Sequence, residues 1–82
     1  FMAYYVYIIK TVKPCKLKSY VGYTVNLSKR LQKHNSGKGA KSTRGYKWML
    51  VYKRYFKYKS KAMSYEYKLK NDRFKRYKIL NK

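Results

Sequence analysis

Acidic side chains are almost absent from this sequence: its 82 residues include 2 Asp plus Glu against 23 Lys plus Arg, for a formal net charge of +21. A chain of this size exposes roughly 5,000 Å² of surface, so the cationic charge is far denser than solubility requires. We therefore expect a polyanionic partner. The shortage of carboxylates argues against two-metal phosphodiesterases, which hold their ions with several of them, and against the paired catalytic carboxylates of glycosidases.

Cysteine and histidine occur once each, as Cys15 and His34. A lone cysteine forbids an internal disulfide, and the two residues supply only half of the ligands of a structural zinc site. A single histidine also excludes a two-histidine acid–base pair. Because a reducing compartment fits this pattern, we expect an intracellular protein of the cytoplasm or nucleoid. No apolar run approaches the roughly 20 residues that cross a bilayer, and we expect no membrane partner.

Aromatic residues are abundant by contrast. They make up 20% of the sequence, with 12 Tyr, and hydrophobic residues make up 45%. A disordered basic tail would be poor in aromatics, so the composition predicts one compact domain over residues 2–82. Phe1 precedes Met2 and is set aside as a scar or processing remnant.

Runs of β-branched and aromatic residues predict three strands, and capping residues with helical spacing predict three helices. We expect the strands at 4–9, 19–24 and 48–56 and a hairpin turn at 13–16. We expect helices at about 27–34 and at about 60–70, and a last short helix capped by Asn71 or Asp72. The fold class is therefore α+β, in the order β-β-α-β-α-α.

The first predicted helix carries two basic side chains of different pKa on one stripe. Thr24 or Asn26 can cap this helix, which begins at Leu27. Arg30 and His34 are four residues apart on it, so they project together.

Gly22 lies inside the second predicted strand, where a glycine weakens pairing and usually indicates the close approach of a backbone or a ligand. We expect it to leave room for a phosphate. Residues 35–47 form a Gly-rich basic loop without apolar periodicity. We expect a flexible segment that contacts phosphates without reading sequence, through Lys38, Lys41 and Arg44.

The second predicted helix places a carboxylate among apolar residues. Ala62, Met63, Glu66 and Leu69 recur at spacings of three and four, so Glu66 is expected within the apolar stripe. A carboxylate in such a place needs compensation, either from a metal ion or from a neighbouring lysine.

Four features occur together in a recognisable order: Tyr5-Val6-Tyr7, then Tyr20-Val21-Gly22, then Arg30 ten residues after Tyr20, then Glu66 in a later helix. This order and spacing resemble the GIY-YIG endonuclease pattern, with Tyr5 in place of the first glycine of the name. The resemblance covers about residues 4–80, and the stretch 27–45 is similar to the small stand-alone subfamily. It implies a three-stranded antiparallel sheet flanked by three helices, and a relation to structure-specific and excision-repair incision nucleases.

The same resemblance implies a metal-dependent endonuclease that hydrolyses DNA phosphodiester bonds with one Mg²⁺ or Mn²⁺. Glu66 would bind the metal, and Arg30 would clamp the scissile phosphate. Tyr7 or Tyr20 would take a proton from the attacking water, with Tyr7 favoured, and His34 could accept the phenolic proton. Because tyrosine normally has a pKa of about 10, we expect the cationic surroundings to lower the pKa of this phenol.

The resemblance also implies a set of residues that contact the substrate. They are Gly22 and Tyr23, and the basic composition of the loop adds Lys38, Lys41 and Arg44. Asn71 and Asn81 are the two candidates for the family's late asparagine.

Each candidate also has an ordinary structural explanation: a core aromatic for Tyr7 or Tyr20, a solvated charge for Arg30, a satisfied helix-end residue for His34, and an ion pair with lysine for Glu66. The corresponding alternative for the whole protein is a non-catalytic basic module that binds nucleic acid. Residue patterns do not decide between DNA and RNA. Because 82 residues leave no room for a specificity domain, we expect the protein either to recognise the structure of its substrate or to need a protein partner that supplies specificity.

Overall fold

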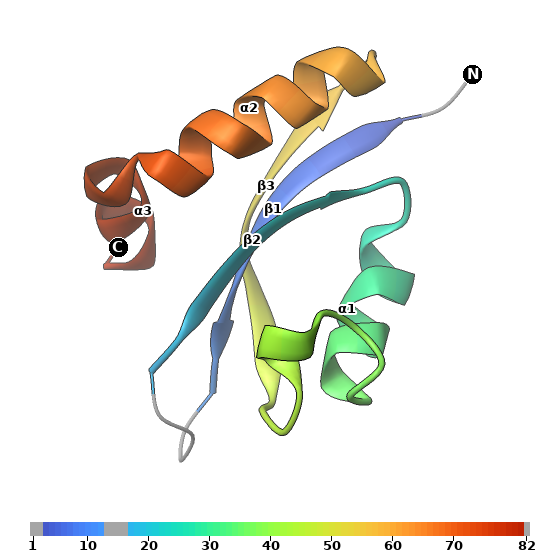
Figure 1. The fold of residues 1–82 in the computed structure, drawn as a ribbon, viewed down its shortest axis with the longest axis vertical. Helices are drawn as coiled ribbons and strands as arrows, with labels where there is room; N and C mark the ends of the chain where they lie inside the picture. Colours follow the sequence, from blue (N-terminus) through green and yellow to red (C-terminus); the bar gives the residue numbers. More distant parts are fainter. Residues whose placement is uncertain (1–2, 13–16, 82) are drawn as a thin grey trace.

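The computed structural model describes residues 3–12 and 17–81. Three antiparallel strands form one sheet in the order β2-β1-β3, with β1 at Tyr4–Thr11, β2 at Ser19–Thr24 and β3 at Trp48–Phe56. The helices are α1 (Leu27–Asn35), α2 (Lys59–Asn71) and α3 (Arg73–Leu80), with a 3₁₀ turn, η1, at Lys41–Thr43. This arrangement confirms the predicted α+β fold and its element order (Figure 1). The predicted turn at 13–16, Cys15 and the remnant at Phe1 lie outside the described residues.

Strand β1 is the centre of the fold, because it pairs with a strand on each side and is covered on both faces. Val6 and Ile8 face one side, Tyr7 and Ile9 face the other, and all four side chains are buried. A run of β-branched and aromatic residues suits a strand buried in this way. The sequence prediction of a strand covered on both faces is confirmed.

Helices cover both faces of the sheet and divide the core into two layers. Val6, Ile8 and Val21 pack with Ala62 and Leu69 of α2 in one layer. The other layer is built around Tyr7, Ile9 and Trp48, against which Leu27 and Leu31 of α1 pack. Figure 1 shows α2 on one side of the sheet and α1 with η1 on the other. Within the described residues, no helix is both long and apolar enough to cross a membrane.

Side-chain caps set the start of two helices, as the sequence predicts. Asn26 accepts a hydrogen bond from the backbone N–H of Lys29 at 3.0 Å, so Asn26 is the cap, and Thr24 lies two residues before it. Asp72 accepts from the N–H of Lys75 at 2.9 Å and opens α3. Each cap satisfies an N–H group that the helix itself leaves without a partner.

The apolar stripe of α2 differs from the one expected. Ala62 and Leu69 are buried, and Tyr65 packs beside them, whereas Met63 is 46% exposed. The stripe follows i, i+3 and i+7, so Glu66 lies at its border with an 18% exposed side chain. Spacings of three and four allow both assignments, and the packing of α2 on the sheet selects one of them.

The basic loop after α1 is tied to the core, which corrects the expectation of a flexible segment. Thr43 is fully buried. Its carbonyl accepts a hydrogen bond from the indole N–H of Trp48 at 2.9 Å, and its backbone N–H donates to Ala40 at 3.0 Å. The loop lacks apolar periodicity because it is anchored by hydrogen bonds at single positions.

Replacing the most central aliphatic side chain should destabilise the protein strongly. Ile8 is fully buried, so Ile8→Ala should lower the free energy of unfolding by about 2–5 kcal/mol. Urea unfolding followed by the fluorescence of Trp48 measures this change. Met63→Ala, on the exposed side of α2, serves as the control and should stay within about 0.5 kcal/mol of the wild type. Equal losses in the two variants would contradict the assigned core.

Candidate active site

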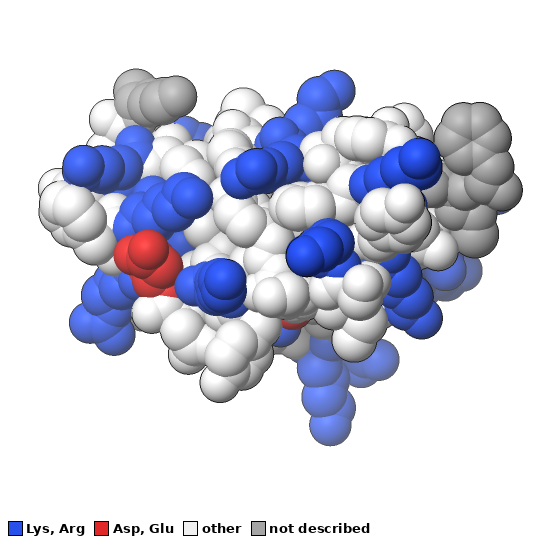
Figure 2. Space-filling model, turned by 90° about the horizontal axis from the view of Figure 1, so that it is seen from above, with Lys and Arg blue, Asp and Glu red and all other residues white. Residues whose placement is uncertain are grey.

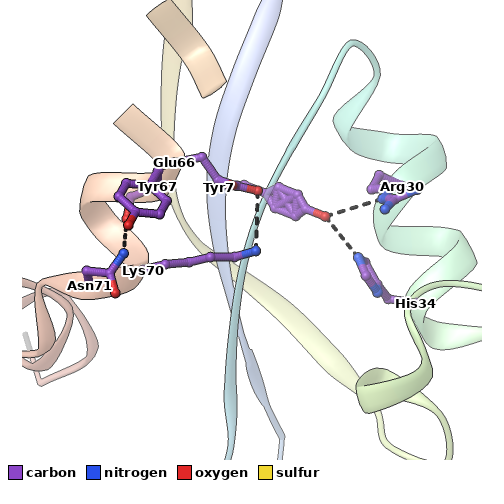
Figure 3. Close-up of polar contacts among 7 residues, drawn as sticks. All are labelled: Tyr7, Arg30, His34, Glu66, Tyr67, Lys70 and Asn71. Atoms are coloured by element: carbon purple, nitrogen blue, oxygen red, sulfur yellow. Dashed lines mark hydrogen bonds and ion pairs between the residues drawn. The ribbon is translucent and has the colours of Figure 1, made fainter. Parts of the chain in front are cut away.

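The phenol of Tyr7 is the meeting point of the candidate site. Its ring leaves β1 on the side covered by α1, where Tyr7 Oη lies 2.9 Å from Nε2 of His34. The Nε–H of Arg30 donates to the same oxygen at 3.3 Å (Figure 3). Two side chains of α1 therefore contact one hydroxyl of the central strand, which confirms that Arg30 and His34 project together.

Tyr20 adds a second phenol to this group from the neighbouring strand. Its ring centroid lies 5.0 Å from that of His34 and 6.4 Å from that of Tyr7. Hydrogen bonding to Tyr7, with a smaller contribution from Tyr20, raises the pKa of Arg30. Four of the predicted catalytic residues thus converge from β1, β2 and α1.

Gly22 has a different role from the one expected. It pairs with Tyr7 across the two strands, and a Cβ atom built on it would lie 2.6 Å from Tyr7 Oη and 3.1 Å from the ring of Tyr20. Contacts this short require a neighbour to move. The space that the missing side chain leaves is thus taken by the phenol of Tyr7, where the sequence analysis expects a phosphate.

Burial controls the protonation of the two central groups. It raises the pKa of Tyr7 above its ordinary value of 10.0, although the hydrogen bond and charge of Arg30 act in the opposite direction. This result corrects the expectation that the cationic surroundings would lower the pKa of the phenol. Burial, together with the charge of Arg30, lowers the pKa of His34. Both groups are therefore neutral at neutral pH, because desolvation disfavours their charged forms.

Glu66 lies on α2, which covers the opposite face of the sheet from the Tyr7 side chain. Its carboxylate forms an ion pair with Lys70 at 3.6 Å, one helical turn away. Its negative charge is the smallest of the influences on the raised pKa of Tyr7, after burial, Arg30 and Tyr20. In the view of Figure 3, Tyr7 lies between the Glu66–Lys70 pair and the two side chains of α1.

The donor set fits one hard cation that keeps most of its water. Among residues 3–12 and 17–81, no group of three or more His, Cys, Asp and Glu side chains could hold a metal ion. Mg²⁺ needs less than that, because it is often bound through one or two carboxylates, several waters and substrate phosphate oxygens. Glu66 supplies one such carboxylate, and an incoming cation must compete with Lys70 for it.

Arg30 also reaches the surface. It lines a cleft of about 490 Å³ together with Tyr4, Tyr23, Val25 and Lys59. A guanidinium that contacts a buried phenol and borders a cleft can hold an anion beside that phenol. The structure places the predicted residue Tyr23 in this cleft. Lys59 was missed, because the first residue of α2 is one lysine among many and no spacing distinguishes it.

The predicted loop cations are exposed, and the predicted asparagines bond to backbone carbonyls. Lys38, Lys41 and Arg44 are exposed around η1. The amides of Asn71 and Asn81 each donate to the carbonyl four residues earlier, at 2.9 Å. Lys and Arg side chains are also scattered over the face seen from above in Figure 2. Burial therefore distinguishes the Tyr7–His34 pair from the exposed cations of the loop.

Two loop residues that the sequence analysis missed contact His34. Thr43 Oγ1 lies 2.9 Å from Nδ1 of His34. A Cβ atom built on Gly39 would lie 2.5 Å from the same nitrogen. Glycine and threonine are common in loops, so nothing in the sequence links these two residues to a histidine on the preceding helix.

Comparison with known proteins assigns this chain to a family. The model of the GIY-YIG catalytic domain matches residues 3–78, and the chain belongs to this family of nuclease domains. Its relatives include UPF0213 proteins. One from Oceanobacillus iheyensis is 45% identical over 80 residues, covering 94% of this chain and 88% of the relative. Another, from Staphylococcus haemolyticus, is 48% identical over 69 residues, covering 82% and 79%.

A solved structure agrees with this assignment. The solution NMR structure of a UPF0213 protein from Bacillus halodurans is 39% identical to this chain, with a TM-score of 0.50. The match covers 98% of this chain and 84% of that one. The family resemblance inferred from Tyr5-Val6-Tyr7, Tyr20-Val21-Gly22, Arg30 and Glu66 is confirmed. Membership in this family supports a nuclease role with a nucleic-acid substrate.

The free energy of unfolding should fall as the pH is lowered from 7 to 5. Inside the fold the pKa of His34 lies below its ordinary value of 6.5, so the unfolded chain binds a proton that the native state does not. The contribution is complete above pH 6.5 and is lost as the pH falls towards the native pKa. Urea unfolding across this range measures it. His34→Gln should remove most of this slope, and an undiminished slope would assign the effect to other groups.

Proposed function

We propose that this protein is a metal-dependent endonuclease that hydrolyses DNA phosphodiester bonds by a one-metal mechanism, with residues 2–82 acting as one domain. The observation that carries the proposal is the convergence of Arg30 and His34 on the hydroxyl group of Tyr7. A module that only binds nucleic acid has no need to bury such a group, since exposed cations suffice for binding.

Arg30 holds the scissile phosphate in this mechanism. Its Nε–H is engaged by Tyr7, and its border position on the 490 Å³ cleft makes the outer edge of the guanidinium available to phosphate oxygens. A planar, permanently charged group matches two such oxygens at once and stabilises the charge that develops in the transition state. Tyr23 and Lys59 flank the same phosphate from the cleft.

Tyr7 acts as the general base through a proton relay with His34. As the attacking water gives its proton to the phenol oxygen, the phenolic proton moves to Nε2 of His34, which lies 2.9 Å away. The phenol oxygen never carries a full negative charge, which is consistent with its raised pKa. The water-derived oxygen attacks phosphorus as the bond between phosphorus and the leaving oxygen breaks. The leaving oxygen stays on the sugar of its own strand end and takes a proton from solvent water. Tyr20 assists by packing against both rings.

Glu66 holds the metal, Mg²⁺ or Mn²⁺. When bound, this ion stabilises the negative charge on the leaving oxygen. When no metal ion is bound, Lys70 forms an ion pair with the Glu66 carboxylate. This pair compensates the partly buried negative charge between turnovers. Such a pair at a half-exposed position is weak, and a divalent cation can replace it.

The surrounding cations give affinity without sequence selection. Lys38, Lys41 and Arg44 contact backbone phosphates beside the cleft, which positions the duplex. Selection for branched DNA or for a particular site comes from the shape of the substrate or from a protein partner.

A nicking assay on two variants, in which either Glu66 or Asp72 is replaced by its amide, tests the metal site. Glu66→Gln should reduce Mg²⁺-dependent cleavage of supercoiled plasmid and branched DNA by on the order of 10²-fold or more, because it removes the charged ligand. Chelation of the metal should abolish cleavage by the wild type. Asp72→Asn is a matched control, since it removes the other acidic side chain and asparagine still caps α3.

Other outcomes reject parts of the proposal. Equal cleavage by Glu66→Gln and Asp72→Asn would remove Glu66 from the metal site. Tight, salt-sensitive binding without cleavage by the wild type in Mg²⁺, Mn²⁺ or Co²⁺ would favour the non-catalytic binding module.

The loop cations should determine part of the salt dependence of binding. On a duplex, each neutralised phosphate contributes about 0.9 to the slope of log K against log salt. Replacing Lys38, Lys41 and Arg44 by alanine should therefore make the slope shallower by roughly 3. Fluorescence anisotropy with a labelled duplex over a salt series measures it. The same charge removed from α2 and α3, in a variant with Lys68, Arg73 and Lys78 replaced, is the control, and an equal change there would contradict a special role for the loop.

A further inference from the structure

The buried side of the Tyr7–His34 pair rests on the loop that follows α1. His34 and Thr43 are both fully buried, and Nδ1 of His34 lies 2.9 Å from Oγ1 of Thr43. The Thr43 hydroxyl also donates to the carbonyl of Ala40 at 2.8 Å. One chain of hydrogen bonds therefore runs from the loop backbone through Thr43 and His34 to Tyr7 and Arg30 (Figure 3 shows its outer part).

The groups at the two ends of this series of hydrogen bonds decide which atom donates and which accepts in each bond. The carbonyl of Ala40 can only accept, so the single hydroxyl hydrogen of Thr43 points to it. Thr43 Oγ1 must then accept from His34, which places the imidazole proton on Nδ1. A neutral imidazole with its proton on Nδ1 has a free lone pair on Nε2. At the other end, Arg30 can only donate to the phenol oxygen, which leaves the Tyr7 hydroxyl hydrogen for Nε2.

We propose that Thr43 is a positioning residue, which fixes the tautomer of His34 so that Nε2 can receive the proton of Tyr7. The proposal rests on the function assigned above to Tyr7 and His34, and it adds a residue that acts through the imidazole without touching DNA. An acceptor on the far nitrogen commonly sets which imidazole nitrogen stays free.

Gly39 supports the same placement from the other side of the loop. An added Cβ atom would lie 2.5 Å from Nδ1 and 3.1 Å from Cα of His34. The backbone at Gly39 thus occupies the space beside the ring and closes the pocket in which Thr43 bonds the imidazole. The loop that presents Lys38 and Lys41 to the substrate therefore also holds the proton acceptor of the site.

Nitrogen NMR of the imidazole tests the proposal directly, because the chain contains one histidine. In untagged, ¹⁵N-labelled protein near pH 8, long-range correlations from the ring protons tell the protonated nitrogen from the unprotonated one. We expect wild-type His34 to be protonated at Nδ1 alone. Thr43→Val keeps the shape but removes the acceptor, and it should shift the proton towards Nε2. Thr43→Ser restores the hydroxyl and should restore the wild-type pattern.

Cleavage kinetics form the second arm of the experiment. Thr43→Val should lower kcat by on the order of 10²-fold, because a misprotonated base loses most of the benefit of acid–base catalysis. KM should stay near the wild-type value, since Thr43 is buried away from the substrate. Thr43→Ser should cleave at close to the wild-type rate. This rescue separates positioning from a general loss of packing.

The outcomes are distinguishable. Wild-type His34 protonated at Nε2 would overturn the proposal without any variant, as would Thr43→Val with an unchanged tautomer and rate. If Thr43→Val does not fold, the tautomers of His34 in the wild type and in Thr43→Ser still test the proposal. A wild type that has the expected tautomer but cleaves no DNA would reject the nuclease mechanism, while the role of Thr43 in fixing the imidazole would stand.

Discussion

The hydrogen bond between the phenol of Tyr7 and Nε2 of His34 joins the central strand of the sheet to helix α1, and the candidate site depends on it. Both side chains are buried, so water cannot replace either partner if the other moves. This requirement explains several separate features. Gly22 has no side chain because the Tyr7 ring lies over it, and Arg30 can hold the phenol oxygen because one helical turn separates it from His34.

A shortage of acidic residues limits the chemistry to one carboxylate. Glu66 lies at the border of the apolar stripe of α2, and Lys70 compensates its charge. With 23 cations in the chain, the surface attracts a polyanion over a broad area, whereas the proposed reaction takes place at the Tyr7 group. Attraction and chemistry are therefore carried by different residues. A cation scattered on the surface raises local substrate concentration, whereas Arg30 must hold a fixed position beside the phenol.

Much of the fold was predictable from the sequence because local signals agree with the tertiary structure. The β-branched run in β1, the cap at Asn26 and the cap at Asp72 each specify an element directly. The predictions failed where packing decides. Met63 and Tyr65 both satisfy helical spacing, and only contact with the sheet shows that Tyr65 is covered. The loop around Thr43 was expected to be flexible because hydrogen bonds between distant residues leave no periodic signal.

The sequence by itself determined the order of the elements, the family, the polyanionic partner and the residues that could act, since these follow from residue types and spacing along the chain. Only the tertiary structure decided what surrounds each side chain. It showed that burial outweighs the charge of Arg30 and raises the pKa of Tyr7, and that Thr43 rests against His34. Desolvation and hydrogen-bond direction depend on neighbours from other elements, and those neighbours are brought together only when the chain folds.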